Sequence, residues 1–111
     1  MEKLKLIINA LEDVNAFDIT AYDTRKVSPF YDYLVIASVT SARGLQASVR
    51  HMADDLSKEG YQELRVEGKD SDSWILIDTN DVIVNVFTKE ERLYYNIEKV
   101  LAGVPEVTMK S

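Results

Sequence analysis

The stretch YLVIASVTSARGLQASVRHMADDLSKEG, residues 33–60, decides the fold of this chain. Its first five residues are apolar at every position, which is typical of a strand covered on both faces and central in a sheet. Thr40 and Ser41 follow and can cap a helix. An apolar stripe then recurs at helical spacing, formed by Leu45, Val49, Met52, Ala53 and Leu56. The pattern predicts a helix over residues 41–58, which Gly60 ends in the left-handed conformation.

Two further elements are predicted before this unit. Apolar residues recur at helical spacing between Lys and Glu near the start, which predicts a helix over residues 2–14. Residues 17–23 then alternate between two sides, as expected for a half-exposed edge strand. Ser28 and Pro29 favour a turn before the central strand.

Three short strands are predicted after the central helix. They cover residues 63–67, 74–77 and 82–87. Polar segments separate them and favour two hairpin turns. The strand, helix and strand over residues 31–67 are expected to form a right-handed crossover between two parallel strands. We therefore predict an α/β (α+β) domain, with a single mixed sheet of about five strands flanked by helices.

The C-terminal part is predicted to close the domain with a helix over residues 89–102. Thr88 and Glu91 have the spacing of a capping box, in which hydroxyl and carboxylate each satisfy a free backbone amide. The apolar stripe continues through Leu93, Ile97 and Val100. Residues 1–102 are therefore expected to form one domain, and residues 103–111 a frayed tail.

Composition limits what the protein can do. The 111 residues are 46% hydrophobic and 29% charged, a balance typical of one globular domain. The 19 Asp and Glu outnumber the 13 Lys and Arg, and a net charge of −6 argues against direct binding to nucleic acid. Cys is absent, which excludes thiolate chemistry and favours a reducing compartment such as the cytoplasm. We find neither a signal peptide nor a membrane-spanning stretch.

The sequence offers little support for catalysis or for a cofactor. The four glycines are too far apart for a phosphate-binding loop. His51, the only histidine, is predicted to lie on the solvated face of its helix. We favour that interpretation over a catalytic base, because the sequence places no nucleophile near it.

Five aspartates lie at predicted strand ends or turns. They are Asp18, Asp23, Asp32, Asp78 and Asp81. Carboxylates at such positions can hold a divalent metal ion or satisfy the backbone of a turn. We favour the turn role and assign no metal ligand. The charged residues of the last predicted helix are spaced as intrahelical pairs.

Trp74 and the neighbouring tyrosines of the last predicted helix are candidates for partner binding. Strand alternation places Trp74 and Leu76 on one face and Ile75 on the other. Trp and Tyr suit interfaces because they combine a large rigid apolar area with a polar group. From the pattern alone, Trp74, Tyr94 and Tyr95 fit a core as well as they fit a binding face.

Several segments agree, in order and in spacing, with one known family. They are Asp18-Ile19, Asp23, Asp32 to Ala37, Thr40 to Arg43, Glu67-Gly68, Trp74 to Asp78, Asp81 to Phe87, and Glu91-Arg92 with Tyr95 and Ile97 to Lys99. Together they resemble the ribosomal silencing factor family, also called the Iojap family. The match spans roughly residues 3–101. Three positions depart from it: Val39 stands where the family usually has Gly, Asn85 where it has His, and Leu101 where it has Trp.

The resemblance implies a fold like that of nucleotidyltransferases without their chemistry. Consistent with this, Thr40 lacks the preceding Gly of the active enzymes, and Asp78 and Asp81 do not form their paired metal motif. It also implies a homodimer that binds the large-subunit ribosomal protein numbered fourteen, on the face of the large ribosomal subunit that meets the small subunit. Translation would then be repressed sterically, without catalysis, nucleic-acid binding or a membrane.

Matching motif positions place the partner contact around Trp74. The candidate contact residues are Trp74, Ile75, Asp78, Asp81, Asn85, Arg92 and Tyr95. Two other functions remain open from the residues. One is a metal-dependent nucleotidyltransferase that uses Asp23, Asp32 or Asp78, and the other is a dimeric adaptor with a non-ribosomal client.

Overall fold

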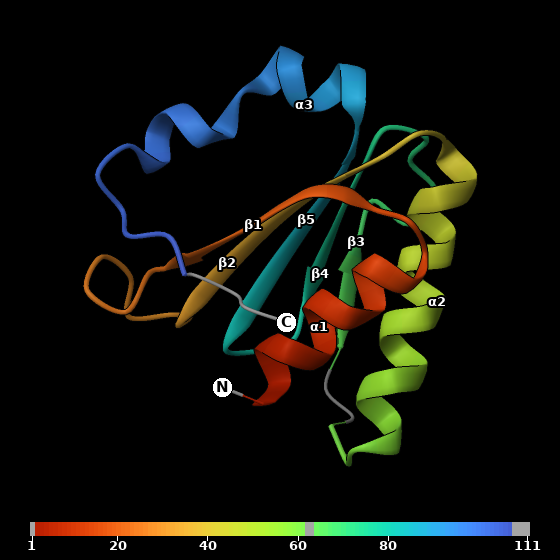
Figure 1. Ribbon diagram of the computed structural model, residues 1–111, viewed down its shortest axis with the longest axis horizontal. Helices are drawn as coiled ribbons and strands as arrows, with labels where there is room; N and C mark the ends of the chain where they lie inside the picture. Colours follow the sequence, from red (N-terminus) through yellow and green to blue (C-terminus); the bar gives the residue numbers. More distant parts are fainter. Residues whose placement is uncertain (1, 62–63, 108–111) are drawn as a thin grey trace.

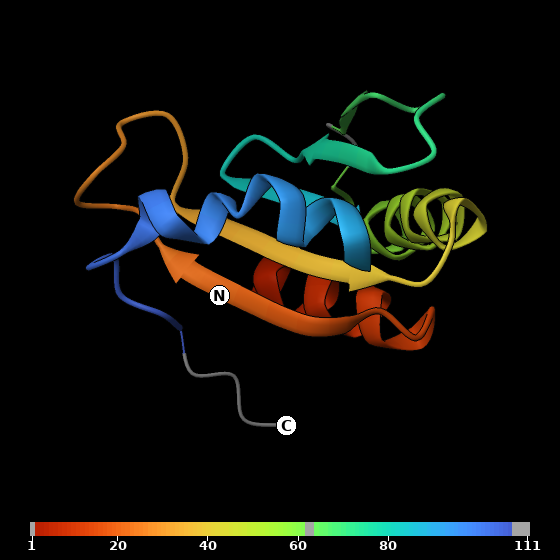
Figure 2. The same cartoon turned by 90° about the horizontal axis from the view of Figure 1, so that it is seen from above.

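The computed structural model describes residues 2–61 and 64–107, which form a five-stranded mixed sheet with helical segments on both faces (Figures 1 and 2). The elements are α1 (Glu2–Asp13), β1 (Phe17–Asp23), β2 (Tyr33–Val39), α2 (Ala42–Lys58), β3 (Arg65–Glu67), β4 (Trp74–Asp78), β5 (Val82–Thr88), α3 (Lys89–Tyr95) and the 3-10 helix η1 (Ile97–Leu101). The predicted α+β class, with three helices and a single mixed sheet, is confirmed.

The strands follow the order β1-β2-β5-β4-β3 across the sheet. β2 and β5 pair in parallel, and the other neighbouring pairs are antiparallel. The predicted edge strand, the covered interior strand and the two hairpins are confirmed. The crossover through α2 joins strands of the same direction, β2 and β3, but β5 and β4 lie between them. Residue 63, where the third strand was predicted to begin, lies outside the described residues.

Helices α1 and α2 cover the first face of the sheet, as their apolar stripes predict. Leu11 of α1 and Met52 of α2 are fully buried. They belong to one apolar cluster with Ile75 and Ile77 of β4. Removing so many apolar side chains from water is the main favourable term in folding, so this face carries most of the hydrophobic stabilisation.

The second face carries a smaller buried cluster. It consists of Tyr22, Leu34, Ile36 and Phe87. Ile97, Leu101 and Val104 of the C-terminal segment pack against it. Figure 2 shows this segment passing over β2. The second face is therefore only partly covered.

The predicted continuous helix over residues 89–102 is wrong. α3 ends one residue before Asn96, whose φ is +48°, and η1 follows. Asn adopts this left-handed conformation more readily than most residues do. The predicted stripe is not formed: Leu93, before the break, is 73% exposed, and Val100, after it, is 82% exposed.

The predicted helix caps have a mixed outcome. Among the described residues, neither Ser41 before α2 nor Thr88 before α3 makes a capping hydrogen bond with its side chain. The capping box is therefore wrong. Glu91 Oε2 instead accepts a hydrogen bond of 2.8 Å from Ser73 Oγ, which ties α3 to the start of β4. Gly60 ends α2 with a φ of +88°, as predicted.

The described part of the C-terminal segment is attached to β1. The Val107 N–H donates to the Ala21 carbonyl at 2.8 Å, and an isolated bridge lies beside it. Residues 105–107, expected as part of a frayed tail, thus bond to the edge strand β1, whereas residues 108–111 lie outside the described chain. No helix within the described ranges is long and apolar enough to cross a membrane.

Candidate partner-binding face

The half-covered second face contains Trp74. Strand pairing places Trp74, Leu76 and Asp78 of β4 beside Phe87, Asn85 and Ile83 of β5. α3 leaves β5 directly at Thr88, which brings the side chain of Tyr95 over Trp74. The sequence therefore folds its sole tryptophan against the helix that follows the sheet.

Trp74 is half-buried and fixed on three sides. Its ring stacks on Phe87, with centroids 4.9 Å apart and planes 25° from parallel. The Tyr95 ring lies 5.0 Å away at 50°. The indole Nε1 donates to Asn85 Oδ1 at 3.0 Å, and Asn85 is only 4% exposed. Because the polar N–H is satisfied inside the protein, the remaining open part of the indole is a rigid apolar surface.

Exposed tyrosines extend this surface. Tyr94 is 79% and Tyr95 47% exposed, and their rings pack edge to face at 5.2 Å. We call the surface formed by Trp74, Tyr94 and Tyr95 the aromatic surface. The structure thus combines the two alternatives that the pattern left open: Trp74 contributes to the second cluster and still reaches the surface. Tyr94 was absent from the contact set predicted by motif position, although its place beside Tyr95 was a signal for it.

Arg92 is turned into the protein. Its side chain is only 11% exposed. The Nε atom donates to Glu98 Oε2 at 3.0 Å, and one terminal nitrogen donates to the Asp18 carbonyl at 2.6 Å and to Ser38 Oγ at 2.9 Å. These bonds connect α3 and η1 to β1 and β2. Arg92 therefore positions the segment that carries the tyrosines, and its guanidinium is already engaged.

The other predicted contact residues lie elsewhere. Ile75 is fully buried on the first face, because alternate residues of a strand point to opposite sides, so its side chain is not available to a partner. Asp78 Oδ1 accepts from the Asn80 N–H at 2.8 Å, which is a turn role. Asp81 pairs with the buried Lys3 at 2.7 Å. Both aspartates lie at the opposite end of β4 from Trp74.

Asp23, a candidate for nucleotidyltransferase chemistry, is paired with Arg25 in the structure. Arg25 donates to both of its carboxylate oxygens, at 2.9 and 2.6 Å. Hydrogen bonds from the side chain and backbone of Arg25 lower the pKa of Asp23 to about 2. Asp23 is therefore a paired surface carboxylate.

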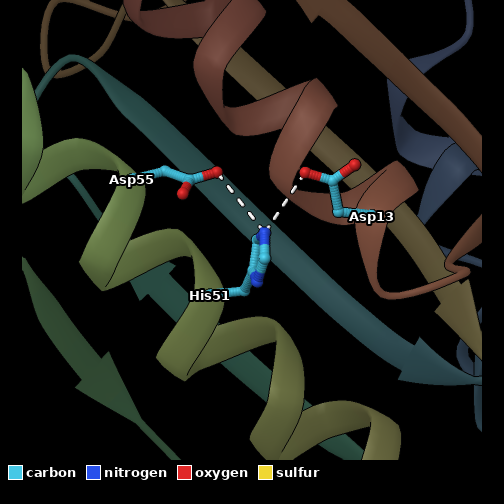
Figure 3. A group of neighbouring side chains, drawn as sticks. All are labelled: Asp13, His51 and Asp55. Atoms are coloured by element: carbon cyan, nitrogen blue, oxygen red, sulfur yellow. Dashed lines mark hydrogen bonds and ion pairs between the residues drawn. The ribbon is translucent and has the colours of Figure 1, made fainter.

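The five aspartates at strand ends do not converge on a common point within the described residues. The group of potential metal ligands found there is Asp13, His51 and Asp55 (Figure 3). His51 is 41% exposed, and its ring faces the two carboxylates. Helical spacing already placed Asp55 on the face of His51, whereas the contact with Asp13 was missed, because Asp13 lies 38 positions away.

A family model described as "Ribosomal silencing factor during starvation" matches residues 1–111, the whole chain. The chain belongs to the ribosomal silencing factor family. This is a family of silencing factors and not of enzymes.

Individual relatives support the assignment of the chain to this family. The chain is 39% identical over 102 residues to the ribosomal silencing factor of Bacillus subtilis, covering 92% of this chain and 86% of that protein. A crystal structure from Bacillus halodurans superposes with a TM-score of 0.85 at 35% identity, covering 97% and 98% of the two chains. The mouse protein "Mitochondrial assembly of ribosomal large subunit protein 1" is 30% identical, covering 87% of this chain and 44% of the mouse protein.

All three departures from the usual family pattern have structural partners in this silencing factor, and Leu101 packs against the second buried cluster. Asn85 accepts the indole hydrogen bond of Trp74. Val39 packs against Gly44, where an added Cβ would lie only 2.9 Å from the Val39 Cβ. A Gly at residue 44 therefore makes room for the larger side chain at residue 39.

Proposed function

We propose that this silencing factor binds the large ribosomal subunit on the face that meets the small subunit, and that it prevents the subunits from joining. Family membership carries this proposal. It is supported by the mouse relative, whose name refers to assembly of the ribosomal large subunit. The large-subunit ribosomal protein numbered fourteen is the proposed direct partner, and the cytoplasm is the proposed compartment.

The aromatic surface is the proposed contact. Exposed Tyr and Trp side chains beside a rigid strand supply apolar area with little loss of conformational freedom, as in many interface hot spots. Glu90 is exposed one helical turn before Tyr94. The net charge of −6 is repelled by RNA and attracted by a basic ribosomal protein. Charge therefore favours a protein contact on the ribosome over a nucleic-acid contact.

Occupancy alone is sufficient for this mechanism. The domain measures 35 × 34 × 26 Å, so a bound copy fills space that the small subunit needs for docking. The extent of inhibition then follows the concentration and affinity of the silencing factor, and no chemical step is required.

Purified ribosomal subunits test the proposal directly. Large subunits are incubated with the protein, small subunits are added, and light scattering reports joining while pelleting reports binding. We expect the protein to pellet with large subunits and to reduce joining in proportion to occupancy. If it neither pellets nor slows joining, the proposal fails and a non-ribosomal client becomes the better interpretation.

Substitutions test the contact itself. Trp74→Ala should cost at least ~2 kcal/mol of binding, a loss of about 30-fold in affinity. Because Trp74 is half-buried, Tyr94→Ala provides a second variant that leaves the fold intact. Phe30→Ala is its matched control, since Phe30 is an 84% exposed aromatic residue in the β1–β2 loop, at the other end of β2 from α3. Equal binding by the Tyr94 and Phe30 variants would exclude the aromatic surface as the contact.

We further propose that free protein forms a homodimer through the exposed apolar side chains of α3 and η1. Leu93 and Val100 are the most exposed aliphatic residues of that segment, and such residues favour association. Sedimentation of the wild type should give a dimer, and the double variant Leu93→Ser, Val100→Ser a monomer. A monomeric wild-type protein at concentrations of about 100 μM would exclude a stable dimer of ordinary affinity.

A further inference from the structure

Three potential metal ligands from two helices meet at the side of α1 and α2 (Figure 3). Asp13 is the last residue of α1, and His51 and Asp55 lie one turn apart on α2. His51 Nε2 is 3.2 Å from Asp13 Oδ2 and 3.6 Å from Asp55 Oδ2. All three ligand atoms lie within 4.8 Å of one another.

These separations fit a tetrahedral metal ion. Zn²⁺ binds imidazole nitrogen and carboxylate oxygen at about 2.0–2.2 Å, so neighbouring ligand atoms lie roughly 3.3–3.6 Å apart. The two distances from Nε2 are close to this range. Asp13 and His51 are 59% and 41% exposed, and small side-chain rotations can bring the two carboxylates to the same separation.

The two carboxylates would also be stabilised by a positive charge between them. A neutral imidazole has one N–H, so Nε2 can donate to one carboxylate at most, while Asp13 and Asp55 repel each other. Asp13 lies in addition at the C-terminal end of α1, where the helix dipole is negative. The last turn of α1, all of it within the described residues, contains no basic side chain.

We propose that Asp13, His51 and Asp55 bind one Zn²⁺-like divalent transition-metal ion. Water completes the coordination. One nitrogen and two oxygen ligands from the protein suit Zn²⁺, Co²⁺ or Ni²⁺, whereas Mg²⁺ prefers oxygen ligands in an octahedral arrangement. The ion fastens the end of α1 to the middle of α2, so its role is to stabilise the helical layer on the first face.

Calorimetric titration of the full chain with ZnCl₂ tests this site. We expect one ion per chain, and at least about tenfold weaker binding in each of Asp13→Asn, His51→Asn and Asp55→Asn. Asp54→Asn is the matched control, because it removes the same charge from the neighbouring, exposed residue of α2 and should leave the affinity unchanged within twofold. Circular dichroism confirms that all four surface variants remain folded.

Three outcomes would overturn the proposal. One is no saturable binding of Zn²⁺ by the wild type. Another is an equal loss in the Asp54→Asn control, because binding would then follow the general acidity of the surface. The third is displacement of Zn²⁺ by an equal concentration of Mg²⁺, which would exclude a site selected by the His51 nitrogen. In the supporting case, Co²⁺ also gives a visible absorption band that disappears in His51→Asn.

Discussion

The two faces of the sheet are covered in different ways. On the first face, helices of 12 and 17 residues bury side chains such as Leu11 and Met52 completely. On the second face, the seven-residue α3 and the 3-10 helix η1 leave Trp74 half-open and Tyr94 exposed. The difference indicates a division of roles: the first face supplies stability, and the second face leaves open the apolar surface that we propose as the partner contact.

A matched pair of leucines is the strongest test of this division. Leu11→Ala on the first face should cost about 2–5 kcal/mol of unfolding free energy, because it opens a cavity in the core. Leu93→Ala on α3 should change that free energy by less than about 0.5 kcal/mol, since the side chain is already exposed. Urea unfolding measures both values. Similar costs for the two variants would contradict a stability difference between the faces.

Loss of the Arg92 side chain should destabilise the second face of the sheet and leave the first face intact. Arg92→Met leaves the largely buried carboxylate of Glu98 without its partner and removes two further hydrogen bonds, which should cost about 1–3 kcal/mol. We expect α3 to move away from Trp74, and the fluorescence of this sole tryptophan to shift to longer wavelength.

Two variants make the Arg92 experiment specific. Lys99→Met removes an exposed cation from η1 and should leave the fluorescence unchanged. The double variant Arg92→Met, Glu98→Met replaces the ion pair with apolar groups and should recover part of the lost stability. If Arg92→Met instead unfolds the whole domain in one step and at the cost of Leu11→Ala, the two faces are not separable.

The sequence predicted those features that depend on local periodicity. The apolar run of β2 and the stripe of α2 predicted two elements with boundaries close to the observed ones. The break at Asn96 was missed because Leu93, Ile97 and Val100 keep a helical spacing that a single left-handed residue interrupts. Such a residue leaves no trace in a hydrophobic pattern.

Non-local contacts were predicted less completely. Motif positions predicted that Trp74, Asn85 and Tyr95 lie together. In the structure, Trp74 contacts both of the other residues. The same reasoning included Ile75, which strand alternation turns into the core. It also could not find the contact of His51 with Asp13, because that contact depends on how α1 and α2 pack.

The smallest expected effect concerns Tyr22, which anchors the second cluster to β1. Burial raises the pKa of its hydroxyl, and the negative charges of Glu106 and Glu98 raise it further. A raised pKa in the folded state favours the neutral phenol, so its contribution to stability is complete below the unfolded value of about 10 and is lost as the pH rises through the folded value. The free energy of unfolding should therefore fall less between about pH 8 and about pH 11 in Tyr22→Phe than in the wild type.

Tyr94→Phe, which changes an exposed tyrosine, should retain the wild-type decrease. If both variants lose stability equally, alkaline loosening of the second face does not begin at Tyr22, and this face is held by Arg92 and apolar packing alone.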